Sequence, residues 1–215
     1  LHFYALCILL GIALAIWLTS RRWRARGQDP DVLWDIIFWA VVAGIVGARA
    51  YHVLITDPAG YFGVGADPLA VFRIWEGGLG IMGAVLFGAG AAWFVSRRNG
   101  LSLSVFADCV APALLLAQAV GRWGNWFNQE LFGRPTTLPW GLEISPSSPN
   151  FPAGLPADTL FHPTFLYESL WNLLGVVLLL ALDRRFQPRH GQLFALYMVF
   201  YGFGRLMIEL FLRVD

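Results

Sequence analysis

Three arginines interrupt long apolar segments of this chain, and they indicate the chemistry to look for. Arg49, Arg122 and Arg205 each lie within a hydrophobic stretch. A charged side chain inside such a stretch is costly, and it marks either a functional site or a buried ion pair. A guanidinium group presents a planar fork of N–H donors that fits the oxygens of a phosphate. These residues therefore favour a phosphate, such as that of a lipid headgroup, as the bound group.

Carboxylates lie in or beside the same segments and are candidate partners of the arginines. Glu168 and Glu209 lie within apolar stretches, and Glu76 begins one. Such acids either pair with arginine to hold helices together or take part in a binding site. For Glu76 and Glu209 taken singly, both interpretations stay open. Asp35 and Asp108 lie close to the ends of their segments, where we expect a solvated or capping role.

The composition predicts that membrane-spanning helices carry these residues. Of 215 residues, 57% are hydrophobic and 13% are charged, which is unusual for a soluble protein. A helix needs about 20 residues to cross the hydrocarbon of a bilayer. Six apolar stretches approach this length: 3–20, 32–54, 76–96, 103–127, 162–182 and 191–212. We therefore expect an all-α polytopic membrane protein, a single transmembrane domain over residues 1–215 with six transmembrane helices.

The distribution of arginine predicts how these spans are oriented. Short cytoplasmic loops carry the positive excess of a membrane protein. Clusters of arginine follow the first, third and fifth spans, and their members are Arg21, Arg22, Arg24, Arg26, Arg97, Arg98, Arg184, Arg185 and Arg189. The N-terminus is therefore expected outside. In this orientation Arg49, Arg122, Glu168 and Arg205 lie at the level of the outer leaflet.

The connection between the fourth and fifth spans is longer than the others. Residues 128–161 contain six prolines and many Ser and Thr residues. Such a composition is typical of turns. We therefore expect a small extracytoplasmic cap at 128–161, built from turns and short strands.

Glycines near the start of the third span have two possible uses. Gly77 and Gly78 would give backbone freedom to a gating segment, and Gly80 and Gly83 would allow helices to approach closely. Helix packing accounts for all four nearly as well.

The fourth span ends in an unusual run of residues that points to a family. Residues 121–134 have the sequence Gly-Arg-Trp-Gly-Asn-Trp-Phe-Asn-Gln-Glu-Leu-Phe-Gly-Arg. This run resembles the signature of prolipoprotein diacylglyceryl transferases. Further stretches agree with that family in order, namely 3–6, 47–49, 75–79, 162–168 and 201–205. The resemblance covers essentially the whole chain.

The resemblance implies a multi-pass enzyme of the bacterial cytoplasmic (inner) membrane. Such an enzyme transfers the sn-1,2-diacylglyceryl group of phosphatidylglycerol to the lipobox cysteine thiol of a prolipoprotein signal peptide. The products are a thioether and glycerol 1-phosphate, and the reaction is the first step of lipoprotein maturation. The active site is expected toward the outer leaflet. No metal, organic cofactor or nucleic acid is expected.

The same resemblance implies which residues act. The matching positions are Tyr4, Arg122, Asn125, Glu130, Gly133 and Arg205. We expect Gly133 to bind substrate and the other five to be catalytic. Further candidates for substrate binding are Arg49, Glu76, Gly77, Gly78, Asn128, His162, Glu168 and Glu209.

The expected roles follow from the charge that develops on the leaving phosphate. Arg122 and Arg205 are the candidates for stabilising it, because fixed cations in a site with little water do so strongly. Asn125 and Asn128 would donate hydrogen bonds to the glycerol headgroup, and Tyr4 would orient it. Arg49 is either a third phosphate contact or a partner of Glu168.

Two features depart from the family pattern. Many members have a histidine, often proposed as the thiol base, at the position that Met82 occupies here. Another base is then needed, and the candidates are Glu130, His52, His162 and Glu168, or a lowered thiol pKa in the field of the arginines. The family also typically has seven spans, whereas six are visible in this chain.

Two other classes of protein compete with the enzyme. A lipid transporter or flippase would use the same arginines to hold headgroups, but it needs charges within the inner half of the spans, and these are scarce. A structural membrane subunit would not require three arginines within its spans. The sequence therefore favours the transferase.

Overall fold

The chain forms two compact units. The computed structural model describes residues 3–63, 65 and 67–212, except for the side chain of Glu76. One unit comprises residues 1–22 and 107–215, and the other comprises residues 23–106. Each is described by itself below. The single transmembrane domain expected over 1–215 stays a prediction.

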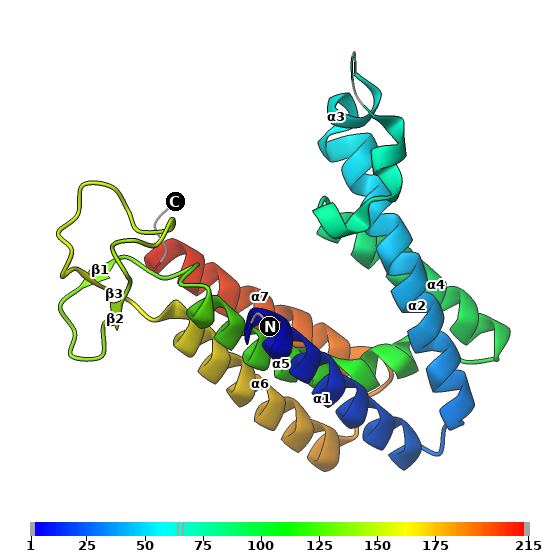
Figure 1. The fold of residues 1–215 in the computed structure, drawn as a ribbon. Helices are drawn as coiled ribbons and strands as arrows, with labels where there is room; N and C mark the ends of the chain where they lie inside the picture. The colour runs from blue at the N-terminus through cyan, green and yellow to red at the C-terminus, as the bar shows by residue number, and fades with distance from the viewer. Residues whose placement is uncertain (1–2, 64, 66, 213–215) are drawn as a thin grey trace. The chain divides into compact units, whose positions relative to one another are not determined.

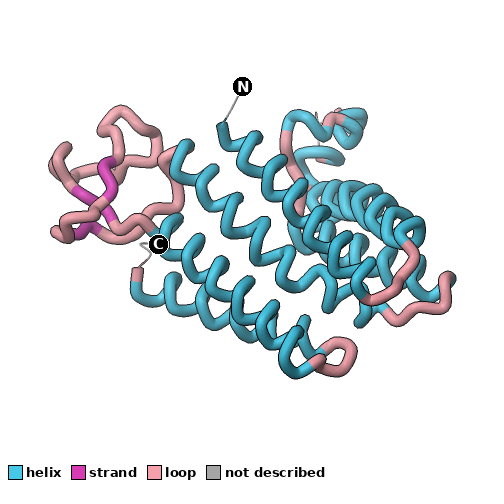
Figure 2. Tube along the Cα trace, turned by 90° about the horizontal axis from the view of Figure 1, so that it is seen from below, coloured by secondary structure: helices cyan, strands magenta, loops and turns pink. Residues whose placement is uncertain are grey.

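The first unit is a bundle of four long helices. They are α1 (Phe3–Ala25), α5 (Leu103–Phe127), α6 (Thr164–Phe186) and α7 (Gln192–Phe211), and they lie side by side in Figures 1 and 2. The core is formed by α5, α6 and α7, whose buried apolar residues are Ala111, Leu115, Val176, Leu179, Leu193 and Tyr197. Helix α1 approaches α5 at Gly11, where a Cβ atom would lie 3.1 Å from the carbonyl oxygen of Ala117.

The second unit is built on the helices α2 (Pro30–Tyr51) and α4 (Ile81–Arg98). A π-helical turn at His52–Thr56, the short helix α3 (Pro58–Phe62) and 3₁₀ turns at Pro68–Phe72 and Ile74–Glu76 connect them. Glycine lets the two helices meet, because a Cβ atom on Gly83 would lie 2.1 Å from the carbonyl oxygen of Gly47. The expected close packing at Gly83 is therefore confirmed.

The segment 128–161 contains the expected short strands. They are β1 (Pro135–Thr136), β2 (Leu142–Glu143) and β3 (Leu160–Phe161), paired antiparallel in the order β1-β3-β2. Figure 2 shows them within a loop-rich part of the first unit. The position of this cap on the extracytoplasmic side stays a prediction.

Among the described residues, five helices are long and apolar enough to cross a membrane, namely α1, α2 with its continuation to Thr56, α5, α6 and α7. Many of their apolar side chains are exposed, such as Val177 and Val199, as expected where lipid is the solvent. This part of the chain is thus consistent with an all-helical polytopic membrane protein. Helix α4 has 18 residues and ends with two arginines, and it is not among the five. The count of six spans and the outside N-terminus stay predictions.

Several expected span boundaries differ from the observed helix boundaries, and two of the differences concern site residues or arginines. The third span begins at Ile81 rather than Glu76, because Gly77 and Gly78 have φ values of 94° and 74° and so lie outside the helical region. The first helix continues to Ala25 instead of ending at residue 20. Arg22, expected in a solvated loop, is therefore helical and buried.

Candidate active site

Two arginines from different helices converge on one buried carboxylate. Glu168 lies on α6, and its Oε2 atom pairs with Nε of Arg122 on α5. Its Oε1 atom lies 3.4 Å from Nη1 of Arg205 on α7. Arg205 also pairs with Glu209 one turn later, with 2.7 Å between Nη2 and Oε2. These four residues, the Glu168 cluster, come from three helices and are all sequence-predicted site residues.

Neighbouring side chains hold the three helices together at this level. The indole Nε1 of Trp123 donates to Oγ of Ser169, at 3.2 Å, which joins α5 to α6. Gly204 lets α6 approach α7, because a Cβ atom there would lie 2.1 Å from Nε1 of Trp171. That nitrogen donates to the carbonyl oxygen of Phe200 at 3.1 Å. The residues around Glu168 thus fix the distances between the charged groups.

The Glu168 cluster retains hydrogen-bond donors that bond none of the described residues. Arg122 contributes only its Nε atom to the ion pair, so its two terminal amino groups make no bond within the described part of the chain. The Arg122 and Arg205 side chains are both partly exposed, whereas Glu168 is buried. Unused donors beside a fixed cation pair are therefore suited to an anionic ligand.

The segment that follows α5 folds back on its own helix end. The amide of Asn125 donates to Oε1 of Glu130 at 2.8 Å, and that of Asn128 donates to the same atom at 3.4 Å. The backbone N–H of Glu130 donates to the carbonyl oxygen of Asn125 at 3.0 Å. Gln129 and Leu131 adopt positive φ values of 50° and 55°, which makes this tight reversal possible. Three predicted site residues are thus gathered around one carboxylate.

Tyr4 lies against this helix end from α1. A Cβ atom on Gly124 would lie 2.8 Å from Cδ2 of the Tyr4 ring. The ring therefore packs on the backbone of α5 between Arg122 and Asn125. The structure thus places Tyr4 against the part of α5 that carries Arg122 and Asn125, which the family resemblance groups with it.

Gly133, near the start of the cap, lies against His162, which follows the last residue of the cap. The N–H of Gly133 donates to the carbonyl oxygen of His162 at 2.9 Å, and a Cβ atom on Gly133 would lie 2.6 Å from the carbonyl oxygen of Leu212. The ring Nδ1 of His162 lies 3.3 Å from the hydroxyl of Tyr167, which also accepts a bond from Trp140. Close packing thus accounts for a glycine at this position, and the substrate-binding role expected for Gly133 stays a prediction.

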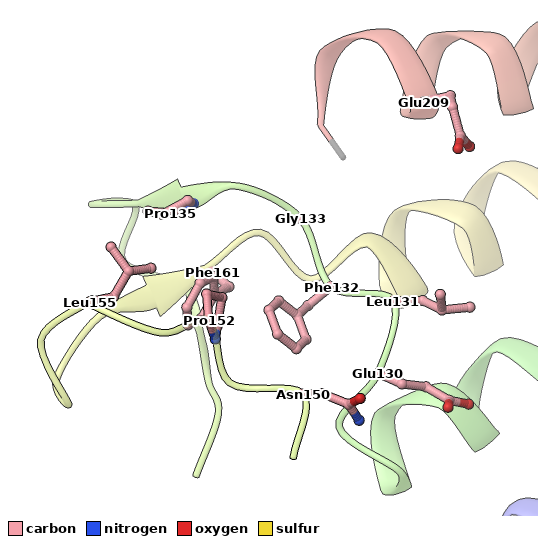
Figure 3. A pocket seen from close by; sticks show the side chains of 10 residues that line it. All are labelled: Glu130, Leu131, Phe132, Gly133, Pro135, Asn150, Pro152, Leu155, Phe161 and Glu209. Atoms are coloured by element: carbon pink, nitrogen blue, oxygen red, sulfur yellow. The ribbon is translucent and has the colours of Figure 1, made fainter. Parts of the chain in front are cut away.

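A cavity of about 970 Å³ opens beside these residues (Figure 3). Its walls are mostly apolar and include Phe132 and Phe161, whose ring centroids are 4.7 Å apart. Glu130 and Glu209 contribute carboxylates from two different parts of the fold. The cavity therefore connects the segment that follows α5 with Glu209 of the Glu168 cluster.

The remaining predicted residues belong to the second unit. The five N–H donors of Arg49 are directed at the backbone carbonyls of residues 70, 71, 73, 77 and 78. Arg49 thus organises the loop before α4, including Gly77 and Gly78. Its role as a phosphate contact, or as a partner of Glu168, stays a prediction. The side chain of Glu76 lies outside the described residues.

Sequence reasoning missed several residues that support the site. Trp123, Ser169 and Tyr167 were not singled out. Trp123 follows Arg122 in the sequence, and the other two flank Glu168. Arg22 was expected in a loop, and it is buried. Asp108, for which a solvated or capping role was expected, is buried and accepts backbone N–H groups at the start of α7. A signal was present for the first group, because aromatic and hydroxyl residues next to intramembrane charges can hydrogen-bond across helices.

Comparison with known proteins adds to this geometry. A model of the family described as prolipoprotein diacylglyceryl transferase matches residues 1–215. A phosphatidylglycerol–prolipoprotein diacylglyceryl transferase of Paenarthrobacter aurescens is 57% identical over 98% of this chain and 68% of its own length. Proteins so named from Streptomyces coelicolor and Frankia alni are 53% and 54% identical over the whole chain. The chain spans 67% and 55% of their respective lengths.

Proposed function

The chain belongs to the prolipoprotein diacylglyceryl transferase family, and from this premise we propose that it transfers the sn-1,2-diacylglyceryl group of phosphatidylglycerol to a prolipoprotein. The acceptor is the lipobox cysteine next to the signal peptide. The relatives that carry this activity in their names are longer than the chain, which spans 67% and 55% of the length of two of them.

The proposed reaction is a substitution at the glyceryl carbon that bears the phosphate. The cysteine thiolate attacks that carbon and forms a C–S bond, while the C–O bond to the phosphate breaks. The electron pair of the broken bond goes to the departing glycerol 1-phosphate. The thiol proton goes to a base, because a free cysteine has a pKa near 8.5 and is only a few per cent ionised at neutral pH.

The single observation that carries the proposal is the convergence of Arg122 and Arg205 on Glu168. Two guanidinium groups with like charge are held close together before any substrate arrives, so little reorganisation is needed when charge develops on the phosphate. We place the lipid phosphate on the unused amino groups of Arg122 and beside Arg205. Glu168 acts as the positioning residue for both.

Glu130 is the best placed of the candidate bases in the first unit. Its Oε1 atom accepts the amides of Asn125 and Asn128, while no bond reaches its Oε2 atom from the described residues. Because Glu130 lines the large cavity, that oxygen can meet a thiol that enters there. Glu168 is already engaged by two arginines. We therefore propose Glu130 as proton acceptor, with the apolar wall of the cavity receiving the peptide next to the cysteine.

The proposed location is the bacterial cytoplasmic membrane, with the Glu168 cluster toward the outer leaflet. This placement rests on the arginine clusters that follow the first, third and fifth expected spans. It also suits the substrates, because both the lipid headgroup and the signal-peptide cysteine are reached at that surface.

The test is transfer with defined substrates. Purified protein in phosphatidylglycerol vesicles is mixed with a peptide that carries a lipobox cysteine, and glycerol phosphate release and peptide mass are followed together. We expect both signals in equal amounts, and neither with a peptide in which serine replaces the cysteine. Release without a change in peptide mass would indicate a lipase. Neither signal with the cysteine peptide across several lipid compositions would overturn the proposal.

A further inference from the structure

A second buried carboxylate connects two helices of the bundle far from the Glu168 cluster. Asp108 lies near the start of α5 and is 1% exposed. Its Oδ2 atom accepts the N–H of Gly191 at 2.7 Å, and its Oδ1 atom accepts the N–H of Phe194 at 2.9 Å. The first N–H groups of a helix have no partner within the helix, and α7 has no side-chain cap of its own. Asp108 of α5 therefore caps α7.

Arg22 extends this contact to the other two helices. Its guanidinium group donates to the carbonyl oxygens of Asp108 at 2.9 Å and Cys109 at 3.2 Å. It also pairs with Asp183 of α6, with 3.1 Å between Nη1 and Oδ2. Arg22, Asp108, Asp183 and the start of α7 form what we call the Asp108 level. All four helices of the bundle meet there.

The spacing between the Asp108 level and the Glu168 cluster is the same on the two helices that carry the arginines. Arg122 follows Asp108 by 14 residues, and Arg205 follows Gly191 by 14 residues. At about 1.5 Å per helical residue, both arginines lie about 21 Å from the level at which α5 and α7 are joined. Helices α5 and α7 run in parallel, so equal spacing brings the two guanidinium groups to one height.

We propose that Asp108 is a positioning residue, which sets the axial register of α7 on α5 so that Arg205 reaches the same carboxylate as Arg122. The functional meaning of this register rests on the proposed function. Sliding α7 by one residue would move Arg205 by about 1.5 Å and turn it by about 100° around the helix, away from Glu168. Burial of apolar surface between the helices is non-directional and does not by itself select one register. Two hydrogen bonds to one carboxylate are directional and specify a single register.

One further bond between the helices agrees with this assignment. The side-chain amide of Gln118 on α5 donates to the hydroxyl of Tyr197 on α7 at 3.2 Å. This contact lies between the two levels. It is a neutral bond between two flexible side chains, whereas Asp108 bonds the backbone of α7 itself. Asp108 is therefore the contact that most directly fixes where α7 begins.

The experiment compares register and activity in variants of Asp108. Asp108→Asn keeps one acceptor oxygen and Asp108→Ala keeps none, while Asp35→Asn changes an exposed carboxylate on α2 and serves as the control. Spin labels at Leu170 of α6 and Leu206 of α7, both exposed, report the distance between the helices by electron resonance. The transfer assay gives kcat per folded molecule, and KM for phosphatidylglycerol.

We expect the label distance in Asp108→Ala to shift by at least about 1.5 Å, the rise of one residue, or to broaden by as much. We also expect kcat to fall about tenfold or more, with Asp108→Asn intermediate and Asp35→Asn unchanged. Unchanged distances and kcat in folded Asp108→Ala would overturn the proposal. So would a loss of thermal stability alone, since that is what a purely structural cap would give. If the unmodified protein shows no transfer, the proposed function fails, and the distances alone decide the role of Asp108.

Discussion

The Asp108 level and the Glu168 cluster are two polar layers in one helical bundle, and they differ in how completely their groups are satisfied. At the Asp108 level the side chains of Asp108 and Arg22 are 1% and 8% exposed, and most of their bonds go to backbone groups. In the Glu168 cluster Arg122 and Arg205 are 17% and 33% exposed, and Arg122 keeps donors that bond none of the described residues.

This difference separates a layer that positions the helices from a layer that binds a ligand. Directional bonds to backbone fix helices in place and leave nothing for a ligand. Side-chain ion pairs with spare donors hold cations ready for an anion that is absent until substrate binds. Both layers contain buried charges, so charge alone does not distinguish them. The predictions below test whether substitutions in the Glu168 cluster mainly lower activity, and whether Arg22→Ala at the Asp108 level mainly lowers stability.

The largest effect is expected from removing a cation of the Glu168 cluster. Arg122→Ala should lower transfer about 10²- to 10³-fold, as for the loss of a group that stabilises charge only in the transition state. Arg205→Ala should behave similarly. The measurement is glycerol phosphate release at saturating phosphatidylglycerol, with membrane insertion checked in parallel. Near-full activity of either variant would show that its role has been misassigned.

A smaller effect is expected from neutralising the carboxylate between the arginines. Glu168→Gln keeps the shape of the side chain but removes the charge that holds Arg122 and Arg205 together. Misplacement of groups by about 1 Å can cost up to about 100-fold in rate, and we expect a loss between tenfold and that limit. The kinetic constants kcat and KM should be measured separately. A variant with normal kcat would mean that the arginines are positioned by other contacts.

For Arg22, which holds the Asp108 level together without capping α7, we expect stability to change more than catalysis. Arg22→Ala removes bonds to two buried carbonyl groups and to Asp183, and should cost about 1–3 kcal/mol of stability. Because these bonds of Arg22 reach α5 and α6, and the two bonds from α7 to the Asp108 carboxylate stay in place, kcat per folded molecule should stay within about threefold. Thermal unfolding in detergent and the transfer assay test these two statements. A large fall in kcat without a loss of stability would contradict the separation.

The smallest effect is expected where Tyr4 packs on α5. A methyl group in Gly124→Ala would press on the edge of the Tyr4 ring, which can turn away on its own side chain. We therefore expect KM for phosphatidylglycerol to rise about threefold, equivalent to about 0.7 kcal/mol, with little change in stability. Gly121→Ala is the matched control, because a Cβ atom there meets only ordinary contact at 3.7 Å. Equal KM values for the two variants would argue against a role for Tyr4.

Much of the bundle could be predicted because the length of an apolar segment depends only on consecutive residues in the sequence. The expected span 103–127 has the same first and last residues as α5. The third span was placed too early because Gly77 and Gly78 look apolar in a hydropathy pattern, while their positive φ values exclude them from a helix. Arg22 was placed in a loop because an arginine cluster marks a span end, although the helix continues through it.

The site was predictable as a set of residues rather than as a set of bonds. Depth alone grouped Arg122, Glu168 and Arg205, since each lies near the same end of its span. Depth could not show that Glu168 is the shared partner, because that depends on which face of each helix turns inward. A capping role was one of the two expected for Asp108, but the helix that it caps could not be predicted, since its partner Gly191 is 83 residues away and contributes only a backbone N–H.

The most direct test of the central claim is phosphorus magnetic resonance of phosphatidylglycerol bound to the purified protein. The account predicts a shifted lipid phosphate signal for the unmodified protein and for Arg22→Ala, and loss of that signal in both Arg122→Ala and Arg205→Ala. A bound-phosphate signal that survives in the double variant of Arg122 and Arg205 would contradict the account, because the lipid phosphate would then be held elsewhere.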